Sequence, residues 1–158
     1  MTHVRATVEV QASPEQVWSV LRDVELWPEW TATVTSVRRL DRGPLAVESR
    51  AHIRQPKLFP AAWEVTELDA GGSFTWVTRS PGVRVTGRHS VEAPQGRSPA
   101  VPSIQFSSPL GPPLARLLRG LKERYLTFEA KSLKAYSEAS AAWSRDSHTT
   151  AAREWSQT

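Results

Sequence analysis

Residues 12–30 read ASPEQVWSVLRDVELWPEW, and this stretch decides the fold. Ser13 and Gln16 have the spacing of a capping box, in which the serine side chain accepts a hydrogen bond from the Gln16 amide and the glutamine side chain accepts one in return. Pro14 suits the first position of a helix, where no backbone N–H is needed. We therefore predict a short helix from Pro14 to about Leu21.

A second short helical turn is expected directly after the first helix. Asp23 is predicted to cap this turn, which runs through Leu26. Pro28 is expected to end it, because proline lacks a backbone donor. Trp30 then leads back into extended chain.

The segment before this stretch alternates between apolar and polar residues. Its apolar positions are Val4, Ala6, Val8 and Val10, and the polar residues between them are His3, Arg5, Thr7 and Glu9. A period of two is typical of a strand with one buried face. The chain therefore begins with a predicted strand.

The chain between Thr31 and Ser107 is rich in Val, Thr, Trp and Phe, and turn residues divide it into short segments. Six strands are predicted there, at residues 31–40, 45–54, 62–68, 73–78, 83–92 and 103–107. Most connections between them are short, which favours an antiparallel meander.

The clearest helical pattern follows the sequence PLGPP at residues 109–113. A helix is predicted from Pro112 to about Ser137, and its apolar residues share one stripe at helical spacing. The stripe consists of Leu114, Leu117, Leu118, Leu121, Tyr125, Phe128, Ala135 and Tyr136. We expect the stripe to pack on the sheet, with Ser132 at its centre and Glu129 as a solvated charge at its rim.

Residues 139–158 show no periodicity and are predicted to form a mobile or weakly helical tail after a domain that spans residues 1–138. The predicted fold class is α+β. It combines a seven-stranded curved antiparallel sheet with two short N-terminal helices and one long C-terminal helix.

Composition restricts the possible classes of function. A length of 158 residues suits one domain, and the chain lacks both a signal-peptide pattern and a membrane-spanning run, so we expect a cytoplasmic protein. The absence of cysteine excludes disulfides and thiolate metal sites. A charge of +4 raises nucleic acid and anionic membrane surfaces as possible partners. Because basic and acidic residues are interspersed, we expect neither partner, and no stable membrane insertion.

The order of one strand, two short helices, six strands and a long helix resembles the START-like superfamily, also called SRPBCC, which includes polyketide cyclases and lipid-transport proteins. Residues 12–23 and 27–30 are similar to the opening segment of that family, and the resemblance extends over residues 4–136, including 63–65 and 87–89. It implies a helix-grip fold with a cavity between sheet and terminal helix, in which members hold lipids, sterols, polyketides or plant hormones. It does not imply one reaction.

Strand alternation and the helix stripe together define a candidate cavity. The predicted ligand-binding residues are Ser49, Ala51, Ile53, Trp63, Val65, Phe74, Trp76, Gly87, His89, Leu117, Leu121, Tyr125, Phe128 and Ser132. Val47 is placed on the same inward face. The small residues Ser49, Ala51 and Gly87 are expected to leave space for a ligand.

Polar groups on the inward faces are the most informative, because burial without a partner costs about 1 to 3 kcal/mol. Three roles stay open for His89: a hydrogen-bonded core residue, a polar anchor for a ligand, or a general acid or base. Tyr125 and Ser132 are candidates to orient a ligand. Leu58 and Phe59 lie between prolines, and we predict that they form part of a lid, the alternative being packing on a strand end.

Sequence motifs of hydrolases, metalloproteases, nucleotide-binding and dinucleotide-binding proteins are missing. The histidines are dispersed, at His3, His52, His89 and His148, so we expect neither a metal nor a cofactor. The leading hypothesis is binding or transfer of a small hydrophobic molecule. One alternative is a polyketide cyclase or aromatase that uses His89 and Tyr125, and another is a protein-interaction or co-chaperone module. The oligomeric state is not predicted.

Overall fold

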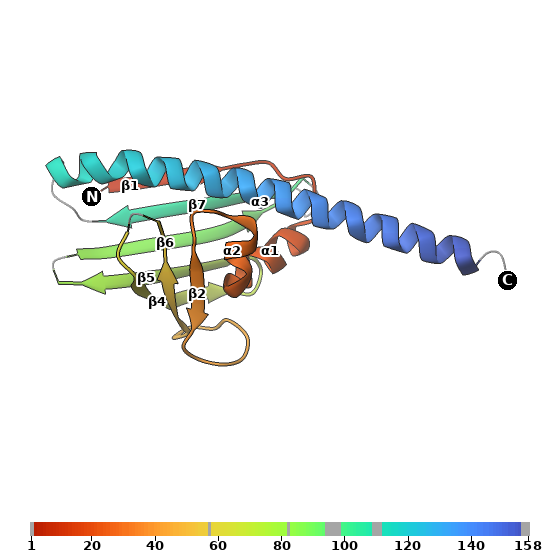
Figure 1. Cartoon of the computed structure of the whole chain (residues 1–158), viewed down its shortest axis with the longest axis horizontal. Helices are drawn as coiled ribbons and strands as arrows, with labels where there is room; N and C mark the ends of the chain where they lie inside the picture. The colour runs from red at the N-terminus through yellow and green to blue at the C-terminus, as the bar shows by residue number, and fades with distance from the viewer. Residues whose placement is uncertain (1, 57, 82, 94–98, 109–111, 156–158) are drawn as a thin grey trace.

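A computed structural model describes the backbone of residues 2–56, 58–81, 83–93, 99–108 and 112–155, together with all of their side chains except those of residues 2, 83, 112–118 and 144–155. Figure 1 shows the arrangement. In chain order the elements are β1 (Thr2–Thr7), α1 (Pro14–Arg22), the 3-10 turn η1 (Val24–Leu26), α2 (Trp27–Trp30), β2 (Ser36–Arg39), β3 (Arg50–Arg54), β4 (Ala61–Asp69), β5 (Ser73–Ser80), β6 (Val83–Glu92), β7 (Val101–Ser108) and α3 (Pro112–Trp155).

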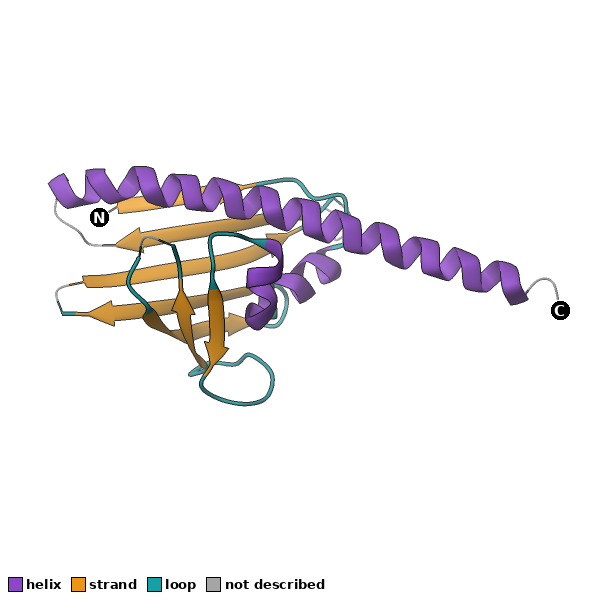
Figure 2. Cartoon of the chain, in the orientation of Figure 1, coloured by secondary structure: helices purple, strands orange, loops and turns teal. Residues whose placement is uncertain are grey.

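The strands form one antiparallel sheet of seven strands in the order β1-β7-β6-β5-β4-β3-β2. The sheet curves, so that β2 and β3 run across the direction of β5 to β7 (Figure 2). The long helix α3 lies over β1 and β7, while α1 and α2 close the other end of the concave face. This architecture confirms the predicted α+β class and helix-grip fold. Among the described residues, no helix is long and apolar enough to cross a membrane.

The predicted capping box is present at the start of α1. Ser13 Oγ accepts from the Gln16 N–H at 3.2 Å, and Gln16 Oε1 accepts from the Ser13 N–H at 3.1 Å. The second helical turn differs from the prediction. Asp23 makes no side-chain cap, and Pro28 lies in the first turn of α2 instead of ending a turn, because the first turn of a helix tolerates proline.

The two predicted strands on either side of residues 40–49 are shorter in the structure. Of the predicted strand 31–40, only β2 is a strand. The residues before it form a turn, in which the buried Thr31 and Thr33 hydroxyls hydrogen-bond to each other at 2.8 Å. Strand 45–54 begins at Arg50, whose N–H donates to Asp41 Oδ1 at 2.7 Å. These side-chain hydrogen bonds replace the backbone hydrogen bonds between strands that the longer predicted strands would have formed.

Val47 was predicted to lie on the inward face. This prediction is wrong, because its side chain is 52% exposed. The neighbouring Glu48 has a φ of 74°, in the left-handed region that a strand does not adopt. The remaining predicted strands are confirmed as β1, β4, β5, β6 and β7, with ends displaced by a few residues.

Helix α3 differs from the prediction in length. It was expected to end near Ser137 but continues to Trp155, projecting beyond the sheet (Figure 1). Residues 139–155 are therefore helical. Alanine, the best helix former, recurs in this segment and supports the helix without any hydrophobic periodicity.

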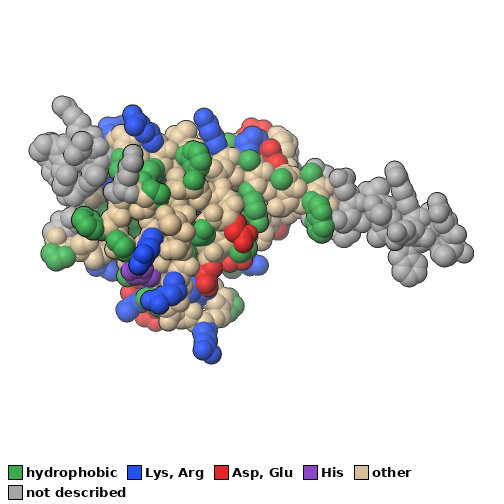
Figure 3. All heavy atoms as spheres, in the orientation of Figure 1, with side chains coloured by type: hydrophobic (Ala, Val, Ile, Leu, Met, Phe, Trp, Pro, Cys, Tyr) green, Lys and Arg blue, Asp and Glu red, His purple; other side chains and the backbone are tan. Residues whose placement is uncertain are grey.

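The face that α3 packs against the sheet also differs from the predicted stripe. Its buried residues are Leu126, Glu129, Ala130, Leu133, Ser137 and Ala141. Several are small, which allows the helix to approach β1 and β7 closely. Of the predicted stripe, Leu121, Tyr125 and Tyr136 are half-buried and Phe128 is 50% exposed, so hydrophobic side chains remain visible along α3 in Figure 3. The side chains of Leu114, Leu117 and Leu118 lie outside those described.

Polar contacts fix α3 to the chain that follows β1. Lys134 Nζ donates to the Glu9 carbonyl at 2.9 Å, and Glu138 Oε1 accepts from the Gln11 N–H at 2.9 Å. Lys134 and Glu138 also pair with each other at 2.5 Å. The hydrogen bond from Lys134, followed by that from the Gln11 backbone, lowers the pKa of Glu138 below its ordinary value of 4.5.

The Glu138 contact predicts a pH-dependent contribution to stability. A carboxyl whose pKa is lowered by folding stabilises the folded state fully above its unfolded pKa, and this contribution is lost as the pH falls through the folded pKa. We expect Glu138→Gln to lower the urea midpoint at neutral pH and to differ little from the wild type well below about pH 4. Glu123→Gln, in an exposed pair on the same helix, is the control. Equal losses at both pH values would contradict the assignment.

Gly87 predicts a steric limit in the sheet. A Cβ at this position would lie 2.7 Å from a Phe106 ring carbon and 2.9 Å from Trp76 Nε1. Gly87→Ala should therefore destabilise the fold by about 1 to 3 kcal/mol in urea titration. Gly120→Ala is the matched control, because a Cβ at Gly120 meets nothing within 4 Å, and it should stabilise α3 by about 0.5 to 1 kcal/mol. A neutral Gly87→Ala would contradict this packing.

Candidate ligand-binding site

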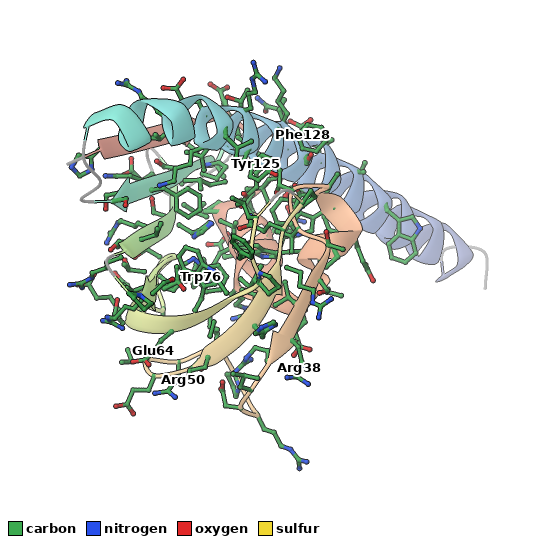
Figure 4. All side chains as sticks on the ribbon, turned by 60° about the vertical axis from the view of Figure 1, so that its left-hand side comes forward. Arg38, Arg50, Glu64, Trp76, Tyr125 and Phe128 are labelled. Carbon is green, nitrogen blue, oxygen red and sulfur yellow. The ribbon has the colours of Figure 1, made fainter. Side chains whose placement is uncertain are left out.

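The concave face of the sheet carries an aromatic wall. Trp63 of β4 lies 5.5 Å from Trp76 of β5 and 6.1 Å from Phe106 of β7, measured between ring centroids. Phe74 meets Trp76 edge-on at 5.2 Å. In Figure 4, Trp76 points from the sheet into the space below α3, and Tyr125 points into the same space from the helix.

Strand alternation placed the sheet residues correctly. The predicted inward residues that the structure buries are Ser49, Ala51, Ile53, Trp63, Val65, Phe74, Trp76, Gly87 and His89. The expectation that Gly87 leaves room for a ligand is wrong, because the rings of Trp76 and Phe106 occupy the space above it. The binding role of the others remains a prediction.

His89 and Glu129 form a buried pair between β6 and α3. His89 is 0% exposed and Glu129 is 2% exposed, and His89 Nε2 lies 3.5 Å from Glu129 Oε1. Among the described residues, neither ring nitrogen nor this carboxylate oxygen has a hydrogen-bond partner. The expectation that Glu129 is a solvated rim charge is therefore wrong.

Aromatic rings enclose His89 on several sides. Its imidazole stacks on Phe74 with a centroid distance of 4.9 Å and an interplanar angle of 9°, and Trp27 lies 4.9 Å away. Trp76 and Phe106 approach edge-on. The imidazole and the carboxylate of Glu129 thus face each other at the base of an apolar interior, where electrostatic interactions are strong.

The β3–β4 loop meets α3 at one end of this interior, and we call this junction the mouth. The Tyr125 hydroxyl donates to the Pro56 carbonyl and so links the helix to the loop. In the same loop Leu58 is exposed and Phe59 is 95% exposed, so in this structure the phenyl ring of Phe59 covers nothing. Their role as a lid remains a prediction.

The helix residues of the predicted site divide into three groups. Leu121, Tyr125 and Ser132 are half-buried on the flank of α3 that looks toward the β3–β4 loop. The placement of Phe128 inside the cavity is wrong, because its side chain lies on the outer side of that flank (Figure 4). Leu117 lies outside the described side chains.

Lys122 is a polar residue that the sequence analysis missed. It is half-buried, and burial lowers the pKa of its ammonium group. Lys122, Leu126, Glu129 and Leu133 recur at helical spacing on the packed face, and this series is the signal that could have found both charged residues. No ion pair to Lys122 occurs within the described part of the chain.

A second hollow lies away from the aromatic wall. A groove of ≈ 800 Å³ runs between α1 and the β2–β3 loop, with Trp18, Arg22 and Leu45 among its walls. None of the residues predicted to bind a ligand lines it. Its residues come from turns and helix flanks, which strand alternation does not identify.

A curved antiparallel sheet closed by a long C-terminal helix, with an aromatic interior between them, defines the START-like class of helix-grip domains. The chain belongs to the polyketide cyclase/dehydrase and lipid transport family, whose model matches residues 1–138. A comparison with curated protein sequences finds no match.

Solved structures share the fold at low sequence identity. A START superfamily protein from Mycobacterium smegmatis is 20% identical with a TM-score of 0.67, over 87% of this chain and 97% of that one. The Zhui aromatase/cyclase from a Streptomyces species is 19% identical with a TM-score of 0.68, over 87% and 93%. The di-domain aromatase/cyclase StfQ of the steffimycin pathway is 12% identical with a TM-score of 0.72, over 89% of this chain and 52% of that one.

The buried pair predicts strong energetic coupling. His89→Leu leaves the Glu129 carboxylate buried without its partner and should cost about 3 to 5 kcal/mol of unfolding free energy. Adding Glu129→Leu removes the stranded charge and should restore most of that loss. Urea denaturation of both single variants and the double variant gives the coupling free energy. Additive losses would show that the two groups do not interact.

Proposed function

We propose that the protein binds and carries a small, mainly apolar molecule between the sheet and α3. The observation that carries this proposal is the position of the half-buried apolar flank of α3, formed by Leu121 and Tyr125. This flank does not pack on the sheet but borders the mouth beside the β3–β4 loop. Half-buried apolar side chains that face an aromatic interior favour an apolar occupant.

The polar groups near the mouth support a ligand with one acceptor end. Tyr125 and Ser132 offer hydroxyls on the flank of α3, and Lys122 offers a half-buried ammonium. A partly desolvated cation gains more from a carboxylate than an exposed one does. A molecule with a ring or acyl body and a carboxylate or carbonyl head matches this arrangement.

A titration with fatty acids, sterols and aromatic polyketides tests the proposal, with tryptophan fluorescence and native mass spectrometry as readouts. Trp63 and Trp76 in the wall should report binding by a change in emission. We expect saturable binding at one molecule per chain. Absence of saturation by all three ligand classes would overturn the proposal.

Lys122 predicts which ligand head is preferred. Lys122→Met should weaken binding of a fatty acid by about tenfold and leave binding of its methyl ester unchanged, because a charge-assisted hydrogen bond is lost only with the acid. Lys131→Met is the matched control, since Lys131 lies exposed on the same helix. Equal effects of Lys122→Met on acid and ester would argue against an ammonium contact.

A second candidate is a polyketide cyclase or aromatase, and the His89–Glu129 pair favours it. A histidine beside a carboxylate in an apolar interior can transfer a proton to or from a bound polyketide. Two of the solved structures with this fold are named as aromatase/cyclases. His89→Ala and Tyr125→Phe should then abolish or slow turnover of a cognate polyketide while Lys131→Met does not. Unchanged turnover in both variants would remove these residues from the mechanism.

A further inference from the structure

Exposed basic side chains occur over much of the described surface, but one end of the molecule carries several of them and almost no acidic side chain. We define the mouth end as residues 53–56, 58–61, 79–81, 83–84 and 119–125, which the sheet register and the contact from Tyr125 to Pro56 bring to the same end. Its described, exposed basic residues are Arg54, Arg79, Arg84, Arg119 and Arg124. Lys122 adds a half-buried positive charge.

Acidic side chains are nearly missing from the mouth end. Among its described residues the single acidic side chain is Glu123, and Arg119 neutralises it at 2.9 Å. The opposite end carries the β2–β3 loop, the β4–β5 turn and the start of α1. Its acidic residues are Glu9, Glu15, Asp23, Glu25, Asp41, Glu48, Asp69, Glu92 and Glu138. They outnumber the basic residues of the same end, which are Arg22, Arg39, Arg42, Arg50 and Lys134, and of which Arg39 pairs with Asp41 and Lys134 with Glu138. The protein is therefore electrically polar along the sheet, with the positive end at the mouth.

The same mouth end has an apolar tip. Phe59 is 95% exposed and Leu58 is exposed beside it, in a loop bounded by Pro56 and Pro60. Proline at both ends limits the backbone conformations of this short loop. A phenyl ring in water without neighbours is unfavourable, and an apolar phase that receives it gains that burial.

We propose that the mouth end docks reversibly on an anionic lipid membrane, with Phe59 and Leu58 entering the interface and the arginines contacting lipid phosphates. Basic residues within a Debye length of an anionic surface attract the protein to it, and interfacial aromatic residues add apolar burial. The acidic opposite end is repelled, so the mouth faces the bilayer. The inference rests on the proposed function, because a ligand then passes between membrane and interior without crossing water.

Nucleic acid is the competing partner for a basic surface. It supplies negative charge but no apolar phase that could take both Leu58 and Phe59 beside the mouth. The contribution of Phe59, measured separately from that of the arginines, therefore distinguishes the two partners.

Vesicle flotation of the ligand-free chain tests the proposal. We expect binding to phosphatidylcholine vesicles that contain phosphatidylglycerol, weaker binding to pure phosphatidylcholine, and loss of binding at high salt. Phe59→Ser should weaken binding about tenfold, as should Arg54→Glu combined with Arg84→Glu. Val47→Ser and Arg42→Glu are matched controls, because both lie exposed in the β2–β3 loop at the opposite end, and they should leave binding unchanged.

Three outcomes would overturn the proposal: no flotation with anionic vesicles, equal weakening by Phe59→Ser and Val47→Ser, or single-stranded DNA binding at least as tight as vesicle binding and unaffected by Phe59→Ser. All of these positions are exposed, so far-UV circular dichroism should show intact folding in every variant. Ligand titration in solution, without vesicles, keeps the two proposals separable. A chain that binds ligands but not vesicles would contradict only the membrane proposal.

Discussion

The structure depends on the burial of Trp27. Its indole N–H donates to the Leu21 carbonyl at 3.0 Å, and its ring contacts Trp30, Phe74, Trp76 and His89. One side chain thus ties the end of α1, the short α2 and the central strands β5 and β6 into a single core. The capping box sets where α1 begins, and α1 in turn sets where Trp27 enters the sheet. This sequence of constraints explains why a short N-terminal stretch determines the arrangement of strands far along the chain.

The same core contains a feature that stability alone does not favour. A buried histidine–carboxylate pair is often less stable than apolar residues of the same size, since both groups lose their hydration. His89 and Glu129 nevertheless join β6 to α3 in the most apolar part of the interior, at a separation of 3.5 Å. Buried polar groups that lower the stability of the fold are characteristic of functional sites. The pair is therefore a candidate for the proton transfer proposed above as well as a packing contact between β6 and α3.

Strand positions and their inward faces could be predicted because side chains alternate between the two faces of a strand. The apolar residues of a strand therefore identify the face that is buried. Trp63, Trp76 and His89 were placed correctly on that basis. The packed face of α3 could not be predicted in the same way. Hydrophobicity pointed to the flank that contains Tyr125 and Phe128, whereas close approach to β1 and β7 selects small residues such as Ala130. Glu129 was missed for the same reason, since a helical wheel centred on the wrong face puts it at the edge.

The antiparallel meander explains why the separation of charges between the two ends of the protein is not evident from the sequence. Successive turns of a meander alternate between the two ends of a sheet, so residues at one end are separated along the chain by residues at the other. Arg54 and Arg79 come together because their strands end on the same side, while Asp41 and Asp69 meet on the opposite side. Charged residues that are interspersed along the sequence are therefore separated between the two ends of the folded protein. Since the junction between α3 and the β3–β4 loop lies at the positive end, the field of the protein points toward the proposed entrance to its interior.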